Sequence, residues 1–164
     1  NRVYKITIMK LREAKIEDSE LIIDFIHKLA IYENLEHEMK VTKELIEKWI
    51  FKEKKSEVLF IIENDKEVGF VLYFYNFSTF VGKPGIYIED IFILEEYRGN
   101  GYGKEVFKYL AKKSVKKGYG RIEWTCLDWN KTAINFYEKM GAIPMGEWTN
   151  YRLNEKAIIK LANS

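Results

Sequence analysis

The chain has 164 residues, of which 47% are hydrophobic, 15% aromatic and 32% charged, and its formal net charge at pH 7 is +2. These values predict one domain over residues 1–164 with a real apolar core, and they exclude a disordered chain. The small net charge disfavours nucleic acid as a partner, and no apolar stretch is long enough to span a bilayer. Without a signal-type leader, a cytoplasmic location and no membrane partner are expected.

Cysteine and histidine give no sign of redox or metal chemistry. The single cysteine, Cys126, excludes an intramolecular disulfide, and its apolar neighbours favour a buried structural thiol over a nucleophile. His27 and His37 stand without metal-ligand spacing, so no metal site is expected.

The first half of the chain predicts a strand, two helices and a hairpin. Residues 4–11 alternate like a strand, and Met9 is an alternative start that would make residues 1–8 an extension. Asp18 and Thr42 are expected to cap the two helices, and Asn64-Asp65-Lys66 is expected to connect strands over 58–63 and 67–75. The apolar faces of the helices are Ile22, Phe25, Ile26 and Leu29 in the first, and Leu45, Ile46, Trp49 and Ile50 in the second.

The second half predicts strands and helices in alternation. A central strand over 86–94 leads to a helix over 103–117 that ends at Gly118, and Arg121 to Leu127 form another strand. A last helix begins near Asn130 and stops at Gly141, and two short strands follow near 143–153. The order of elements predicts an α/β (mixed α+β) fold, with a mixed, mostly antiparallel sheet of about six to seven strands and helices on both faces.

A glycine-rich turn lies between the central strand and the next helix. Its sequence is Arg98-Gly99-Asn100-Gly101-Tyr102-Gly103. At a helix N-terminus, free backbone N–H groups and the helix dipole attract anions, and glycine lets a phosphate approach the backbone. The turn therefore predicts a pyrophosphate site.

Two common phosphate-binding motifs do not fit this turn. A P-loop needs Lys followed by Ser or Thr after its last glycine, whereas Lys104 is followed by Glu105. A dinucleotide-binding turn needs G-x-G-x-x-G, whereas the three glycines here have G-x-G-x-G spacing. The P-loop interpretation therefore fails, and the dinucleotide-binding interpretation is poor.

The turn resembles the acyl-CoA pyrophosphate loop of the GCN5-related N-acetyltransferases, and the likeness extends from about Leu11 to Leu161. The closest likeness is to the branch of spermidine/spermine N1-acetyltransferases and thialysine acetyltransferases. The stretches that carry it are Lys-Leu-Ala-Ile-Tyr-Glu at 28–33, Tyr-Ile-Glu-Asp-Ile-Phe-Ile at 87–93, Asp-Trp-Asn at 128–130 and Asn-Phe-Tyr-Glu-Lys-Met-Gly-Ala at 135–142.

The resemblance implies roles for particular residues. Glu89 would be the general base, acting through water, and Tyr137 the general acid toward the coenzyme thiolate. Asn130 would lie beside the thiol. Acetyl-CoA would be held by the backbone of Ile91 and Ile93, by the loop residues Arg98, Gly99, Asn100, Gly101, Tyr102, Gly103 and Lys104, and by Asn130 and Tyr137.

Amine chemistry independently requires a proton acceptor. A primary amine with a pKa of about 10.4 is neutral in only about one part in 2500 at pH 7, a cost of about 4.6 kcal/mol. A partly buried carboxylate with a raised pKa can accept that proton. Glu89 and Asp90 are adjacent on a strand, so they are expected to project to opposite faces. They are therefore expected to have separate roles, and the resemblance assigns amine binding to Asp90 and the base to Glu89.

The acceptor is less well defined than the reaction. Ser78 stands where the polyamine enzymes have an acidic residue, which makes a thialysine-like or lysine-like amine a candidate beside spermidine and spermine. Tyr32, Glu33, Glu36, Phe80, Glu89 and Asp90 are the expected acceptor-binding residues. A protein or peptide amine acetyltransferase and a noncatalytic acyl-CoA sensor are the alternatives. A homodimer is implied by the resemblance.

Overall fold

The computed structural model describes residues 9–164, which form two compact units that divide after Thr125. Each unit is described by itself. The expected strand over 4–11 lies mostly outside the described residues, and its described part begins β1. The question of an extension over 1–8 lies outside them too.

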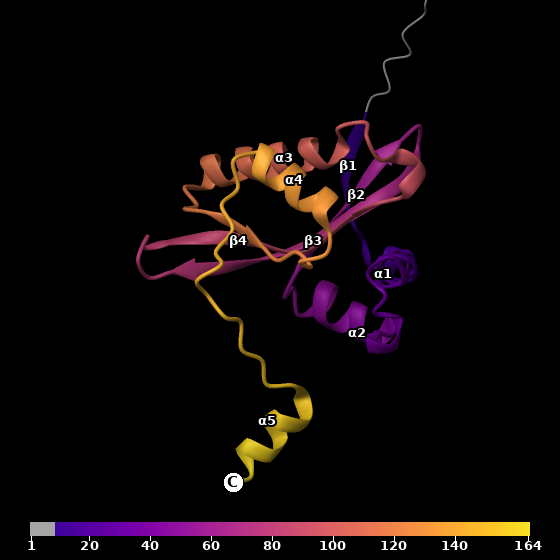
Figure 1. The fold of residues 1–164 in the computed structure, drawn as a ribbon. Coiled ribbons are helices and arrows are strands. Elements are labelled where there is room, and N and C mark those ends of the chain that lie inside the picture. Colours follow the sequence, from indigo (N-terminus) through magenta and orange to yellow (C-terminus); the bar gives the residue numbers. More distant parts are fainter. Residues whose placement is uncertain (1–8) are drawn as a thin grey trace, which may run out of the picture. The chain divides into compact units, whose positions relative to one another are not determined.

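The first unit is built on one five-stranded sheet in the order β1-β2-β3-β4-β5 (Figure 1). The first four strands pair antiparallel, and β5 pairs parallel with β4. The mixed, mostly antiparallel sheet is confirmed, and within residues 9–164 it has five strands instead of six or seven. The strands are β1 Met9–Glu13, β2 Glu57–Glu63, β3 Lys66–Ser78, β4 Lys83–Ile93 and β5 Ile122–Trp124.

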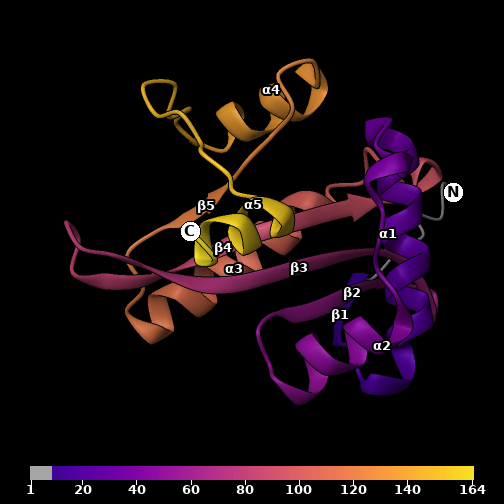
Figure 2. The ribbon, with the colours of Figure 1, turned by 90° about the horizontal axis from the view of Figure 1, so that it is seen from below.

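Helices cover both faces of this sheet, as expected. Figure 1 shows α3 on one side and α1 and α2 on the other, and Figure 2 views the sheet from the side of α1 and α2. A π-helical stretch, Glu47–Lys52, continues α2. The helices are α1 Ser19–Glu33, α2 Lys43–Ile46 and α3 Tyr102–Lys117, and short 3-10 turns lie at Ile16–Asp18, Glu36–Glu38 and Glu95–Tyr97.

The core beneath α1 follows the predicted apolar pattern. Phe25 of α1 stacks on Phe70 of β3 with ring centroids 5.6 Å apart. Burial of such large side chains is worth about 1.5–3 kcal/mol each and fixes α1 on the sheet. The buried cluster comprises Ile22, Phe25, Leu29, Ile46, Ile50, Val58, Phe60, Phe70 and Phe92. Leu45 and Trp49, which were expected on the same face of the second helix, are exposed.

Two local predictions are confirmed and one is wrong. Asn64 and Asp65 both have positive φ, the backbone of a tight hairpin turn, and Thr42 caps α2 by accepting the N–H of Leu45 at 3.3 Å. Asp18 stands at the start of α1 but does not cap it with its side chain. Its carboxylate instead binds the Arg12 guanidinium at 2.8 Å, because an ion pair competes with the cap.

The helix α3 is held to the sheet by a charged network. The Lys113 ammonium donates to Glu57 Oε2 and to the hydroxyl of Tyr73, each at 3.1 Å, and Tyr73 is only 1% exposed. Gly118, with φ 75°, ends the helix as predicted.

The second unit contains α4 Lys131–Lys139 and α5 Glu155–Ala162. The helix α4 begins next to Asn130, as predicted, and Asn130 caps it by accepting the N–H of Ala133 at 3.2 Å. The two short strands expected near 143–153 are wrong, because this stretch is irregular and forms no sheet pairing among the described residues. Strand-forming side chains such as Trp148 do not make a strand without a paired partner, and Pro144 lacks an N–H to donate.

The cysteine and the helices can be compared with what the composition predicts. Cys126 is half-buried, not buried, in the second unit. Across residues 9–164, no helix combines the length and apolar character needed to cross a membrane.

Candidate active site

A break in strand pairing places the two adjacent carboxylates of β4. Asp90 pairs with Leu72 of β3 and Ile88 pairs with Tyr73, so Glu89 is an extra residue, as in a β-bulge. The expectation that Glu89 and Asp90 project to opposite faces assumed unbroken alternation, and that premise is wrong at this position. Glu89 is exposed, and its charge acts on Asp90.

Asp90 has an unusual environment. Burial, with smaller contributions from the charges of Glu89 and Glu33, raises the pKa of Asp90 to about 7. Burial also raises the pKa of Glu33, the last residue of α1. The carboxyl group of Asp90 can therefore take up and release a proton near neutral pH.

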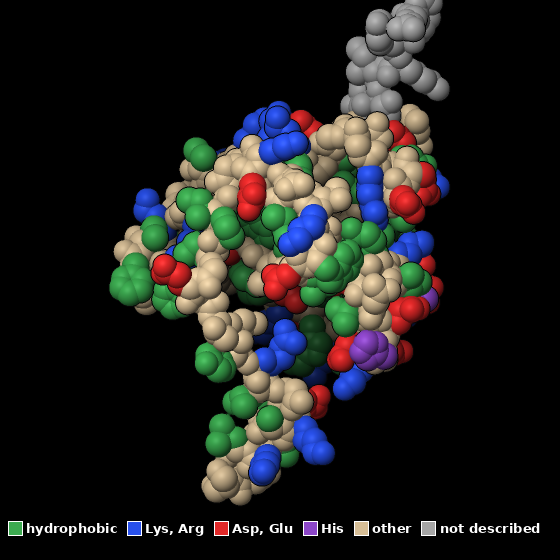
Figure 3. Space-filling view, in the orientation of Figure 1, with side chains coloured by type: hydrophobic (Ala, Val, Ile, Leu, Met, Phe, Trp, Pro, Cys, Tyr) green, Lys and Arg blue, Asp and Glu red, His purple; other side chains and the backbone are tan. Residues whose placement is uncertain are grey.

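Asp90 opens into a pocket of about 290 Å³ on the α1 face of the sheet, at the small end of the range for small-molecule sites. Its lining combines apolar side chains with three carboxylates and one lysine. Acidic side chains also gather around a histidine beside α1 and α2 in Figure 3. The pocket is lined by Ile26, Leu29, Ala30, Glu33, Leu35, Glu38, Met39, Lys40, Val41 and Asp90.

Only some of the predicted acceptor-binding residues line this pocket. Glu33 and Asp90 line it, whereas Glu36 lies within 3.6 Å of His27 and Tyr32 contacts Phe92, with ring centroids 6.2 Å apart. Glu38 and Lys40, which sequence reasoning missed, lie in the connection between α1 and α2, Glu38 at the end of its 3-10 turn and Lys40 just after it, where no periodicity marks a pocket.

Two residues of the β3–β4 turn do not reach the pocket. Phe80 is 96% exposed, and the seven residue-to-residue steps from Lys83 to Asp90 put it about 23 Å or more along the strand from the pocket. Ser78 is buried in the same turn, where its hydroxyl accepts the N–H of Val81 at 3.2 Å. It therefore shapes the turn.

The glycine-rich loop has the geometry of an anion site. Gly99 and Gly101 both have φ 79°, and a Cβ at either position would meet nothing within 4 Å, so open space adjoins the backbone. No backbone hydrogen bond between described residues uses the N–H groups of residues 99–104. These groups meet at the N-terminus of the 16-residue α3, near the positive end of its dipole.

Side chains of the loop fix its shape. The Tyr102 hydroxyl is hydrogen-bonded to the Glu63 carboxylate and anchors the start of α3 to β2. The Asn100 amide donates to the carbonyl oxygen of Tyr97 at 3.0 Å. Gly103 and Lys104 follow in the first turn of α3, where Lys104 is exposed and adds a positive charge.

Arg98 connects the loop with β4 and α1. Its Nε donates to the carbonyl oxygen of Ile93 at 2.8 Å, and its guanidinium carbon lies 4.6 Å from the ring centroid of Tyr32 and 5.3 Å from that of Phe92. Contacts of this kind hold the guanidinium beside the loop.

The outer edge of β4 is open between the bulge and the loop. Within the described sheet, β5 pairs only with Ile86 to Ile88. The stretch from Glu89 to Ile93, which includes Ile91, therefore has no strand partner in the sheet on that side. Such an edge can pair with the amides of an extended ligand.

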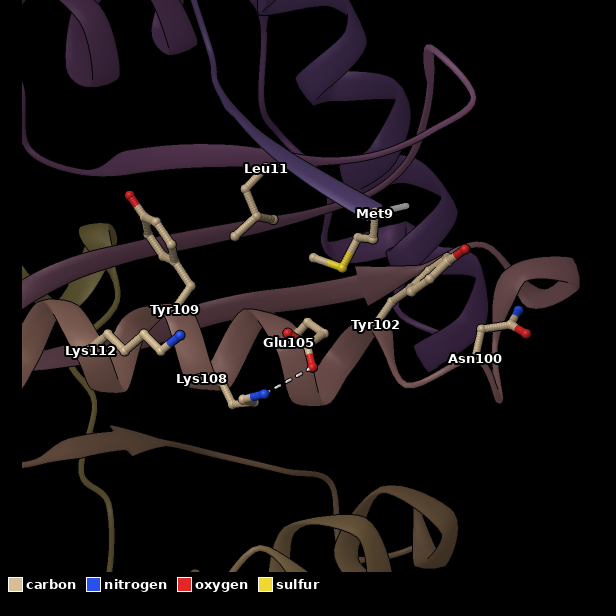
Figure 4. Close-up of a pocket in the computed structure, with 8 residues that line it drawn as sticks. All are labelled: Met9, Leu11, Asn100, Tyr102, Glu105, Lys108, Tyr109 and Lys112. Atoms are coloured by element: carbon tan, nitrogen blue, oxygen red, sulfur yellow. Dashed lines mark hydrogen bonds and ion pairs between the residues drawn. The ribbon is translucent and has the colours of Figure 1, made fainter. Parts of the chain in front are cut away.

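A second hollow, of about 530 Å³, lies along α3 on the β1 side (Figure 4). Glu105 is bound by Lys108 at 3.3 Å, and Lys112 adds another positive charge. This hollow therefore suits a cationic acceptor poorly. Its lining is Met9, Leu11, Asn100, Tyr102, Glu105, Lys108, Tyr109 and Lys112.

The remaining predicted site residues, Asn130 and Tyr137, belong to the second unit. Asn130 caps α4, and Tyr137 lies within that helix, with its ring centroid 5.5 Å from that of Phe136. Their roles toward the coenzyme stay predictions. Among residues 9–164, no group of three or more His, Cys, Asp or Glu residues is arranged to hold a metal ion.

Comparison with known proteins shows the family of the chain. The sequence model of the acetyltransferase (GNAT) family matches residues 23–142. The chain is 32% identical to the thialysine N-epsilon-acetyltransferase of Mus musculus, with 93% of this chain and 96% of that protein covered. Over 90 residues it is 52% identical to an L-ornithine N5-acetyltransferase of Arabidopsis thaliana, a match that covers 55% of this chain and 40% of that relative.

A solved structure shares the fold. An integron cassette protein from the mobile metagenome of V. cholerae superposes with a TM-score of 0.78 at 25% identity, and the match covers 95% of this chain and 98% of that one. The thialysine relatives confirm the resemblance to the expected branch. The chain therefore belongs to the acetyltransferase (GNAT) family and is an acyltransferase enzyme.

Proposed function

We propose that this enzyme transfers the acetyl group of acetyl-CoA to a primary amine of a small polyamine or diamino acid. One observation carries the proposal: a single strand, β4, presents two carboxylates at a bulge and an open backbone edge, and the free amides of the glycine-rich loop follow it. Acetyl transfer needs a proton acceptor and a coenzyme site side by side.

The loop fits the pyrophosphate of the coenzyme. The N–H groups of residues 99–104, which donate to no backbone oxygen of the described residues, and the α3 dipole would bind its oxygens, and Lys104 would add charge. The Arg98 guanidinium donates only through Nε in the described contacts, which leaves its two terminal nitrogens for phosphate. The open edge at Ile91 and Ile93 would pair with the amides of the pantetheine arm.

The pocket on the α1 face fits a cationic acceptor. The carboxylates of Glu33 and Asp90 would attract an ammonium group, and the apolar side chains beside them would hold its methylene groups. The small volume favours a small amine over a peptide, which is the alternative acceptor.

Proton removal from the amine is assigned to the β4 carboxylates. Glu89 is exposed and would act through a water molecule, as proposed for the general base. Asp90, with a pKa raised to about 7, is a second candidate, because a base is most effective when its pKa lies near the working pH.

Acetyl-CoA supplies a thioester whose coenzyme part leaves as a thiolate. Tyr137 would donate its phenolic proton to that thiolate, and Asn130 would lie beside the sulfur; both roles rest on the family resemblance.

A homodimer is also proposed on the ground of the family resemblance, and the exposed apolar side chains of Ile158, Ile159 and Leu161 on α5 are candidates for its contact surface.

The test is direct detection of product. Purified enzyme is incubated with acetyl-CoA and, separately, with lysine, thialysine, ornithine, putrescine, spermidine or a lysine peptide, and acetylated products are identified by mass spectrometry. We expect monoacetylated small amines, as the names of the thialysine and ornithine relatives suggest. Acetylation of the peptide alone, or of none of these amines, would contradict the proposal.

A further inference from the structure

The acidic pocket at Asp90 contains one positive charge that the proposed reaction does not use. Lys40 lines this pocket together with Glu33, Glu38 and Asp90. Among the ion pairs formed by described residues, none includes Lys40, although three carboxylates line the same pocket. An ammonium that is left available beside carboxylates is suited to an anion brought by a ligand.

The backbone on both sides of Lys40 is held in place. The Met39 N–H donates to the carbonyl oxygen of Glu36 at 3.1 Å, Val41 packs against the core cluster, and Thr42 caps α2. Lys40 is therefore presented from a fixed stretch of chain, while its side chain is exposed.

The two candidate acceptor classes differ in the charge that this lysine would meet. A polyamine carries only ammonium groups, so its far end would bring positive charge toward Lys40. A diamino acid carries two ammonium groups and one carboxylate. The pocket offers the complementary set, which is carboxylates for two ammonium groups and one ammonium for a carboxylate.

We infer that Lys40 is a specificity-determining residue that binds the α-carboxylate of a diamino acid acceptor and disfavours polyamines. Glu33 and Glu38 would then hold the α-ammonium group, and the side-chain amine would extend to Asp90 and Glu89. This inference rests on the proposed acetyl transfer to a small amine and names the class of that amine. Specificity arises here from attraction of one class and repulsion of the other.

The test compares acceptors that differ only in the carboxylate. L-Lysine and cadaverine form one pair and L-ornithine and putrescine a second, and L-lysinamide keeps the α-amine but loses the negative charge. For each, kcat/KM is measured for the wild type, for Lys40→Gln and for Lys40→Glu. Lys10→Gln is the matched control, because Lys10 is also exposed and lies on β1, outside the pocket.

We expect Lys40→Gln to lower kcat/KM for lysine and ornithine about three- to tenfold, as fits an exposed charged contact, without lowering it for cadaverine, putrescine or lysinamide. Lys40→Glu should lower the value for lysine further and raise that for cadaverine. Lys10→Gln should change none of these values, and the Kd for acetyl-CoA should stay the same in all variants.

The outcomes separate failure of the inference from failure of the proposed function. If the wild type acetylates small amines but Lys40→Gln leaves the ratio of kcat/KM for lysine to kcat/KM for cadaverine unchanged, the proposed role of Lys40 is wrong. An equal loss of kcat/KM for both members of a pair would also overturn this role, since a specificity-determining residue must act on one member more than on the other. If the wild type acetylates no small amine, the proposed function itself fails.

Discussion

Replacing Asp90 by Asn should stabilise the protein, and the gain should depend on pH. The substitution keeps the shape of the side chain and removes its titration. Burial and the charges of Glu89 and Glu33 raise the pKa of Asp90 from 3.8 to about 7 in the folded state. Between these values the unfolded chain loses the proton while the folded chain keeps it, so the stability of the wild type falls as the pH rises from about 4 to about 7. Above about 7 the penalty is constant.

The magnitude follows from the two pKa values. Linkage gives a penalty of about 2 kcal/mol at pH 5 and about 4 kcal/mol at pH 8. Asp90 is partly accessible to water, which reduces the difference between the two pH values to about 1 kcal/mol. Asp90→Asn should therefore gain more stability at pH 8 than at pH 5 by about this amount.

Urea unfolding at pH 5 and pH 8 measures the gain. The control is Glu44→Gln, which removes an exposed carboxylate with no ion pair among the described residues, and it should change stability by less than about 0.5 kcal/mol at either pH. An equal gain for Asp90→Asn at both pH values would show that Asp90 titrates normally, and the interpretation of its environment would be wrong.

Three other substitutions test separate parts of the account. Arg98→Ala should weaken acetyl-CoA binding about tenfold in a calorimetric titration, because a charged contact to phosphate is lost; an unaltered Kd would remove Arg98 from the phosphate site. Tyr137→Phe should lower kcat about 10²-fold or more while the Kd for acetyl-CoA is retained, and full turnover would exclude the proposed general acid. Lys113→Met should destabilise the fold by about 2–3 kcal/mol in urea, because Glu57 and the Tyr73 hydroxyl lose their shared ammonium; a loss below about 0.5 kcal/mol would show that this network contributes little.

Much of the fold could be predicted from local pattern. The apolar spacing of Ile22, Phe25 and Leu29 and the turn at Asn64-Asp65 depend on interactions a few residues apart, and both are confirmed. The strands expected near 143–153 depend on pairing with a distant edge, which local pattern does not report. The helix α5 was missed, although Asn154 caps it by accepting the N–H of Ala157 at 2.9 Å, a signal that the sequence does contain.

The candidate site could be predicted less completely. The glycine-rich loop could be predicted because an anion site depends on backbone geometry, and glycine indicates the positions where such geometry occurs. The bulge at Glu89 arises from the register between two strands, so the unbroken alternation assumed along β4 does not hold at this position. Glu38 and Lys40 line the acceptor pocket from the short connection between α1 and α2, and only the folded chain brings them near Asp90.

The central claim is that the carboxylates at the β4 bulge take the proton from the amine. Its most direct test is single-turnover acetyl transfer by Glu89→Gln and Asp90→Asn, each preloaded with acetyl-CoA, with the coenzyme Kd measured in parallel. The account predicts that Glu89→Gln binds acetyl-CoA as the wild type does but transfers the acetyl group about 10²-fold more slowly. Transfer rates within about threefold of the wild type in both variants would contradict it.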